Sequence, residues 1–264
     1  PYNDCYFDNI SFYRRLNSLF CNVNYGFHSV VTNWTVNQPL YRLVWQYYFE
    51  CDLGIPVPAR QRVVTGVPMQ DQLMQSKEKL QDPWKQMPVK MKRIIYAPHH
   101  TIGEMHLKGL ATSSFMENAF VMLELMRKYR DKVQWAFKPH PILYAKLIEV
   151  WGKEKTDAYY AEWRDAENAQ LETGGYNALF AYSDAMIHDC VSFVIEYQYT
   201  KNPVLYLIRS EGRESNWSAL SAGAFDLHYK GHTREDIERF IENVINGVDP
   251  VKEQREDFYN RMLI

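Results

Sequence analysis

The sequence lacks several motifs by which common enzyme classes are recognised. It contains no GxGxxG glycine pattern, no Walker A loop and no GxSxG segment. These patterns mark dinucleotide-dependent oxidoreductases, nucleoside triphosphatases and α/β-hydrolases, respectively. The residues therefore give no support to any of these three classes.

Cysteine is also scarce, and long apolar runs are missing. The four cysteines form no CxxC pair and show no spacing typical of zinc sites, so we expect buried free thiols in a reducing compartment. No apolar run approaches the roughly 20 residues that a membrane-spanning helix needs. No signal peptide is visible, and because the chain begins with Pro1 we expect a fragment or a trimmed chain.

Excess charge of either sign is absent as well. The 264 residues include 30 basic and 32 acidic side chains, a formal charge of −2, which argues against nucleic acid as a partner. Hydrophobic residues make up 46% of the chain, enough for a sizeable core in one large or two modest domains. The aromatic content of 15% fits an aromatic-rich core or a cleft that holds rings and sugars.

Proline and glycine cluster in residues 53–92, where a short apolar strand at Val63-Val64 ends at Gly66. We interpret this segment as the end of one domain and a linker to the next, with the division between residues 84 and 85. Before it, apolar residues recur at three- and four-residue spacing, which predicts an amphipathic helix; they are Leu40, Leu43, Val44, Tyr47 and Tyr48.

From residue 93 onward, apolar strand-like runs alternate with helical patterns. The predicted strands cover 93–97, 133–137, 185–187 and 204–208. The predicted helices cover 115–129, about 143–170, 193–199, a segment between a Thr233 N-cap and Gly247, and an amphipathic tail over 251–264. Within the 115–129 helix we expect Phe120, Leu123 and Met126 to share the apolar face. This alternation predicts an α/β fold in which helices cover both faces of a parallel sheet.

In such sheets, ligands bind beyond the carboxyl ends of the strands. The loops that follow residues 97, 137, 187 and 208 should therefore share one edge and line one cleft. They contain the segments Pro98-His99-His100-Thr101, Lys138-Pro139-His140-Pro141, His188-Asp189-Cys190-Val191-Ser192 and Arg209-Ser210-Glu211-Gly212-Arg213.

The segment from Asp189 to Glu196 has the pattern of a phosphate site. A helix predicted to begin near Ser192 offers free N–H groups and a partial positive charge, to which the Ser192 hydroxyl adds a donor. Glu196, one turn further on, is placed to accept from ribose hydroxyls. The alternative is that Asp189 and Ser192 only cap the helix.

His140 lies between two prolines, which hold the backbone of the turn rigid. A histidine placed in this way can donate to a phosphate oxygen or exchange a proton near neutral pH, although a histidine in a turn is more often only a polar residue exposed to solvent.

The other polar residues of these loops leave alternatives open. Adjacent His99 and His100, with His106 nearby, suggest metal, but carboxylate or cysteine partners at ligand spacing are missing. We therefore expect phosphate or substrate contact, and neither a metal site nor a cofactor. Arg209 and Arg213 either neutralise a diphosphate or belong to a solvated loop.

Five segments, in matching order and spacing over roughly residues 60–210, resemble motifs of the CDP-glycerol glycerophosphotransferases. They are Gly66-Val67-Pro68-Met69-Gln70-Asp71 beside the family's "GxPRxD", Ile94-Ile95-Tyr96-Ala97-Pro98 beside "ilYAPT", Phe137-Lys138-Pro139-His140-Pro141 beside "RxHP", Ser183-Asp184-Ala185-Met186-Ile187-His188-Asp189-Cys190-Val191-Ser192 beside "SDvlItDYSS", and Lys201-Asn202-Pro203-Val204-Leu205 beside "KPvl". The chain departs from these motifs at Met69, Lys138 and Cys190, which replace an arginine, an arginine and a tyrosine, and Val191 replaces the first serine of "DYSS".

The resemblance implies a GT-B fold, in which two Rossmann-like domains face each other. Residues 1–84 would be part of the N-terminal, acceptor-side domain with its linker, and residues 85–264 the C-terminal domain that binds the nucleotide donor. The implied reaction moves glycerol phosphate or a related polyol phosphate from a CDP-linked donor to a polymer or lipid-linked acceptor of the bacterial wall or capsule. The implied location is cytoplasmic, at the inner face of the membrane, where the tail either contacts lipid or packs back onto the protein.

The resemblance also implies roles for individual residues. His140 would lie near the transferred phosphate, and His28 is the candidate for the family's second functional histidine. Asp189 and Ser192 would contact the donor phosphates, and Glu196 the ribose. The remaining predicted donor-binding residues are His99, His100, Lys138, Arg209 and Arg213.

Two other functions remain open. A GT-B glycosyltransferase that uses a nucleotide sugar would share the fold but break a different bond. A non-catalytic member would bind a nucleotide or a glycan without turnover. The departures from the family motifs fit such a member.

Overall fold

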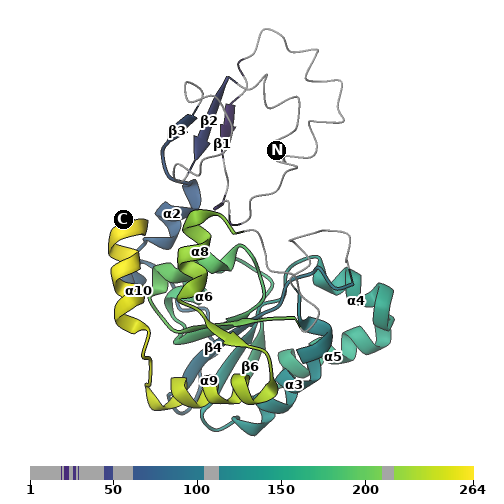
Figure 1. Cartoon of the computed structure of the whole chain (residues 1–264). Coiled ribbons are helices and arrows are strands. Elements are labelled where there is room, and N and C mark those ends of the chain that lie inside the picture. Colours follow the sequence, from purple (N-terminus) through teal and green to yellow (C-terminus); the bar gives the residue numbers. More distant parts are fainter. Residues whose placement is uncertain are drawn as a thin grey trace.

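The structure is a computed structural model that describes residues 19, 21–23, 26–27, 29, 45–49, 62–103, 113–209 and 217–264. These residues form two parallel β-sheets of unequal size (Figure 1). The small sheet has the order β1-β2-β3, and the large sheet has the order β6-β5-β4-β7-β8-β9. Figure 1 shows the small sheet at one end of the molecule, next to helix α2 (Pro68–Leu73).

The small sheet corrects one prediction. Its strands are β1 (Cys21–Val23), β2 (Gln46–Phe49) and β3 (Arg62–Val64). The predicted helix around Leu40 to Tyr48 is wrong in its described part, because β2 occupies it. Three successive aromatic residues at 47–49 favour an extended pleated chain, and β2 pairs on both sides with parallel neighbours. The strand predicted at Val63-Val64 is confirmed.

The six strands of the large sheet are all parallel. They are β4 (Lys92–Ala97), β5 (Val133–Phe137), β6 (Ala169–Leu171), β7 (Ala185–His188), β8 (Val204–Leu207) and β9 (Tyr229–Gly231). Numbered by chain order within this sheet, they run 3-2-1-4-5-6, the doubly wound arrangement. The connections reverse direction between β4 and β7, so the switch point lies at the carboxyl ends of these two strands. The four strands predicted from sequence are confirmed, whereas β6 and β9 were not predicted.

Alternate residues of the central strands enter different cores. Ile94 and Tyr96 belong to one buried cluster, and Ile95 and Ala97 to another on the opposite face. This period of two is what a strand buried on both faces requires, and it explains why β4 reads as a continuous apolar run.

Helices cover both faces, as predicted. The first cluster includes residues of α3 (Phe115–Lys128), α4 (Leu143–Trp151), α5 (Lys153–Asp165) and α9 (Arg234–Asn246). The opposite face packs against α6 (Asn177–Ala181), α7 (Phe193–Glu196), the 3₁₀ helix η6 (Tyr197–Thr200) and α8 (Ala219–Asp226). A further 3₁₀ turn, η5 (Lys77–Lys79), precedes the large sheet.

Two details of the predicted helices are wrong. The single helix expected over 143–170 is two helices and a strand, because Gly152 adopts a φ of 81° between α4 and α5. Phe120 does not lie on the buried face of α3 and is 49% exposed, with its ring stacked on Trp151. Leu123 and Met126 are buried as predicted, together with Met122 and Leu125.

The C-terminal segment is helical, as predicted. Thr233 caps α9 in a reciprocal capping box with Asp236, and Gly247 ends the helix at a φ of 71°. The tail forms α10 (Lys252–Phe258) and a final π-helical turn, η7 (Tyr259–Leu263). Leu263 is buried against the body, and its carbonyl accepts from Gln70 at 2.9 Å. Of the helices in the described part of the chain, none combines the length and hydrophobicity that a membrane crossing needs.

Candidate active site

Asp189 organises the switch point. It directly follows β7, is 1% exposed, and its Oδ1 accepts the backbone N–H of His99 at 2.6 Å. Its Oδ2 accepts from the backbone N–H of Ser114 at 2.6 Å and from the Ser114 hydroxyl at 3.1 Å. Burial raises the pKa of this carboxyl to about 6, although these hydrogen bonds oppose the rise. Asp189 thus joins the loop after β4 to the start of α3; its predicted contact with donor phosphates stays a prediction.

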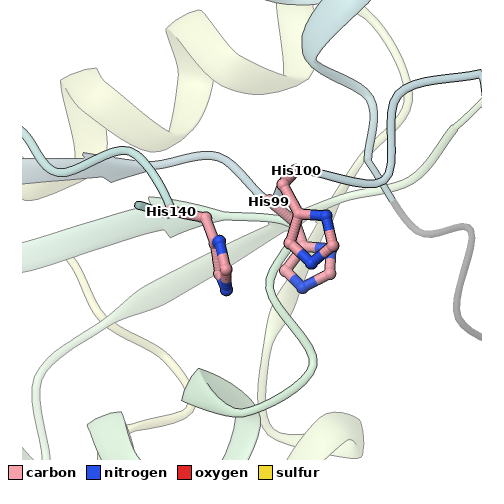
Figure 2. Close-up of side chains that lie close together, drawn as sticks. All are labelled: His99, His100 and His140. Atoms are coloured by element: carbon pink, nitrogen blue, oxygen red, sulfur yellow. The ribbon is translucent and has the colours of Figure 1, made fainter. Parts of the chain in front are cut away.

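Three histidines meet at the same edge. Figure 2 shows the imidazole of His140, from the loop after β5, beside those of His99 and His100, from the loop after β4. The ring centroids are 4.2 Å apart for His100 and His140, 4.3 Å for His99 and His100, and 5.1 Å for His99 and His140. One nitrogen from each ring can be chosen so that all three lie within 4.8 Å of one another. The structure therefore brings together three of the residues that we predicted to line one cleft because they follow strands of a parallel sheet.

Backbone hydrogen bonds fix the relative position of the two loops. The N–H of His140 donates to the carbonyl of Pro98 at 3.0 Å, and the Ser113 hydroxyl donates to the carbonyl of His99 at 2.9 Å. Nδ1 of His99 lies 3.0 Å from the Thr101 hydroxyl, which orients that ring. The N–H of Ile142 donates to Nδ1 of His140 at 3.2 Å. In neutral His140 the proton is therefore on Nε2, as a donor to phosphate requires.

Burial keeps two of these imidazoles neutral. Desolvation, followed by the neighbouring His100 and His140, lowers the pKa of His99 to about 3. Desolvation, followed by His100 and Lys138, lowers the pKa of His140 to about 4. Neutral His99 and His140 avoid the repulsion that neighbouring imidazolium ions would suffer.

Two predicted basic residues lie at the same strand ends. Lys138 follows β5 and is buried, and burial lowers the pKa of its ammonium group, against an opposing effect of Glu172. Arg209 follows β8, and its buried Nη1 has no hydrogen-bond partner among the described residues. An unsatisfied guanidinium nitrogen is a donor available to an anion.

Glu196 is a buried carboxyl with one oxygen free. It is 3% exposed, and its Oε2 has no hydrogen-bond partner among the described residues. Burial raises its pKa to about 7, although a hydrogen bond from Tyr176 opposes the rise. The other oxygen, Oε1, lies 3.6 Å from the point that a Cβ on Gly26 would occupy, so the Glu196 carboxyl faces the N-terminal part of the chain.

Ser192 lies at the N-cap position of α7, but its side chain makes no capping hydrogen bond and is exposed. The capping alternative for this hydroxyl is therefore wrong. Asp189 does bind the start of a helix, but the helix is α3 and not α7: its carboxylate accepts a hydrogen bond from Ser114, the N-cap residue of α3. Sequence reasoning missed this partner, Ser114, although Thr112-Ser113-Ser114 before an apolar helix is a start signal.

The remaining residues considered in the sequence analysis add nothing to the described site. His28, Arg213 and His106 are outside the described residues. His188 turns away from the edge into the core, where its ring packs against Tyr206 and His228.

A pocket also lies at the opposite end of the sheet. Its lining includes Met91, Asp131 and Asn168, which precede β4, β5 and β6, respectively. One of its charged residues, Arg127, already pairs with Glu162 at 2.7 Å. We place the candidate site at the carboxyl edge, because the three histidines and the unpartnered Nη1 of Arg209 lie there.

The strand order and the position of the site define the class: a doubly wound α/β fold of the GT-B type. In solved structures the chain is similar to the wall teichoic acid polymerase TagF with CDPG (15% identity, TM-score 0.59, covering 94% of this chain and 64% of TagF). It is also similar to MnaA of S. aureus with UDP (16% identity, TM-score 0.53, covering 92% of this chain and 63% of MnaA). A third similar structure is UDP-GlcNAc 2-epimerase of Neisseria meningitidis bound to UDP-GlcNAc (16% identity, TM-score 0.52, covering 96% of this chain and 71% of the epimerase). The chain thus spans about 63–64% of the length of TagF and MnaA. No curated protein matches it in sequence.

The model of the family CDP-glycerol:poly(glycerophosphate) glycerophosphotransferase matches residues 26–211. This range covers most of the chain, including β4 to β8 and their connecting loops. The chain belongs to this family, which confirms the resemblance seen in its sequence motifs.

Proposed function

We propose that this chain is the donor-binding part of a transferase that moves glycerol phosphate, or a related polyol phosphate, from a CDP-linked donor to a hydroxyl of a cell-wall or capsule polymer. The observation that carries the proposal is the position of His140 beside His99 and His100 at the switch point of the large sheet. Ligands of doubly wound folds bind at this point. Family membership and the TagF-like fold support the same function.

In this proposal, residues 85–264 hold the nucleotide donor, and residues 1–84 belong to the acceptor side with its linker. Oε2 of Glu196 accepts from a ribose hydroxyl, which satisfies its missing hydrogen bond. Arg209 and Lys138 face the donor phosphates, and the exposed Ser192 hydroxyl adds a donor. Asp189 acts through the loops that it holds together.

The chemistry requires no covalent intermediate with the enzyme. The acceptor hydroxyl attacks the phosphorus that bears the polyol, a new P–O bond forms, and the bond from that phosphorus to the oxygen of CMP breaks. The hydroxyl proton passes to a base on the acceptor side, for which His28 is our candidate as a second functional histidine. His140 is neutral in the free protein and carries its proton on Nε2, so it can donate to an oxygen of the transferred phosphate and stabilise the negative charge that develops there.

Nucleotide selectivity tests the proposal. We expect calorimetric titrations with CMP and CDP-glycerol to show binding, and those with UDP and UDP-GlcNAc to show at least tenfold weaker binding. Glu196→Gln should weaken cytidine nucleotide binding, because an amide is a poorer acceptor for a ribose hydroxyl. The matched control Glu167→Gln, at an exposed position, should leave binding unchanged. Uridine selectivity would instead favour the alternative of a nucleotide-sugar enzyme; UDP is the nucleotide in the solved complex of MnaA.

A further inference from the structure

We propose that His99, His100 and His140 form a binding site for one divalent transition-metal ion of the zinc type, whose open coordination position takes an oxygen of the donor diphosphate. The metal site itself rests on the geometry of the three rings. Only the identity of the oxygen ligand rests on the proposed function.

The three rings have the arrangement that such a site needs. A tetrahedral zinc site places its nitrogens about 2.0–2.1 Å from the ion and therefore roughly 3.3 Å from one another. The nitrogens of the cluster lie within 4.8 Å of one another, so the site closes with shifts of about 1 Å, within reach of small side-chain rotations. Three protein nitrogens leave a fourth position for a substrate oxygen, the pattern of catalytic rather than structural zinc.

The chain builds this cluster in a way that local sequence does not suggest. Adjacent side chains point to opposite sides of an extended strand, but His99 and His100 lie beyond the end of β4, and their ring centroids are only 4.3 Å apart. The hydrogen bond from His140 to Pro98 holds the third ring in register with them. Because backbone bonds set these positions, the site is largely preorganised.

The hydrogen bonds of the rings are compatible with coordination. The Thr101 hydroxyl bonded to Nδ1 of His99 is the outer partner that commonly orients a metal-binding histidine and leaves Nε2 for the ion. His140 would move its proton to Nδ1 and give up its bond from Ile142, and the ion would replace the Nε2 proton as the group that contacts the phosphate oxygen. That amide is exposed, so water can replace the lost partner.

The ligand chemistry selects the class of ion. Three imidazole nitrogens, with no carboxylate in the cluster, suit zinc and similar transition metals, whereas magnesium and calcium prefer oxygen ligands. A divalent ion would also supply positive charge that neutral imidazoles cannot. The proposed function assigns two cations at these strand ends, Lys138 and Arg209, to the diphosphate, and the ion would add to their charge.

Zinc binding to the full chain tests the inference. The purified protein is stripped with a chelator, equilibrated with Zn²⁺ by dialysis, and its bound metal is measured by mass spectrometry; Co²⁺ gives a visible absorption spectrum that reports coordination geometry. We expect one equivalent of zinc and a tetrahedral cobalt spectrum. His100→Gln and His140→Gln should each weaken zinc binding at least tenfold. The matched control His232→Ala, an exposed histidine far along the chain, should leave it unchanged.

The outcomes separate this inference from the proposed function. Stoichiometry near zero, or equal zinc binding by the His100→Gln, His140→Gln and His232→Ala variants, overturns the metal site. If zinc binds at the cluster but no CDP-linked donor binds or reacts, the metal site stands and the proposed function fails. If CMP release proceeds at full rate in the chelated, zinc-free protein, the role of the ion in donor binding is wrong. Circular dichroism of each variant establishes that loss of zinc binding is not loss of the fold.

Discussion

Replacing Glu196 with glutamine should stabilise the protein at alkaline pH while weakening nucleotide binding. Burial raises the pKa of Glu196 from an ordinary value of 4.5 to about 7. The folded state therefore holds a proton that the unfolded state has lost, and stability falls as pH rises from about 4.5 to about 7. Between pH 5 and pH 8 this single group should lower the free energy of unfolding by about 2–3 kcal/mol, since one pKa unit corresponds to about 1.4 kcal/mol.

The measurement compares urea unfolding of the wild type and Glu196→Gln at pH 5 and pH 8. Using the difference between the two proteins cancels all other titrating groups. We expect the variant to gain about 2–3 kcal/mol relative to wild type on going from pH 5 to pH 8. A relative stability that does not change with pH would show that Glu196 titrates normally, and the reasoning from its burial would be refuted. The control Glu167→Gln should show no such pH dependence.

Two further substitutions test the supports of the site and of the fold. Asp189→Asn should lower the free energy of unfolding by about 2–4 kcal/mol, because an amide nitrogen would face N–H and O–H groups that now donate to the carboxylate. Thermal unfolding measures this loss. The control Asp165→Asn, at an exposed position, should change the stability little. An unchanged melting temperature would contradict the role of Asp189 in joining the loops. Thr233→Ala should cost about 1 kcal/mol by removing the capping box with Asp236, and a loss well below that would show that the cap contributes little.

The carboxyl-edge location of the site could be predicted because it follows from topology. Four apolar runs alternating with helices imply a parallel sheet, and a parallel sheet places the loops after those runs at one edge. His99, His100 and His140 therefore meet as the strand ends require. The two loops are held together by a backbone hydrogen bond from His140 to Pro98. Such a bond joins residues far apart in the chain, so no local sequence pattern could predict it.

Other features could not be read from the sequence, for identifiable physical reasons. The strand β6 has only three residues and too few apolar side chains to be recognised as a strand. For this reason the polar helix predicted before it included these residues. Gly152 breaks that pattern through a positive φ that composition alone does not distinguish from a tolerated helical glycine. His188 shares its loop with Asp189 but points into the core, since the direction of a side chain at a strand end depends on the register of that strand.

The most direct test of the proposed transfer is CMP release from CDP-glycerol in the presence of a polymer acceptor, measured for the wild type and His140→Ala. We predict CMP and a new phosphodiester in equal amounts with the wild type. For the variant we predict a turnover number lower by at least a hundredfold, with the affinity for the donor changed much less. Release of CMP by His140→Ala at the wild-type rate would contradict the central role of this histidine at the switch point.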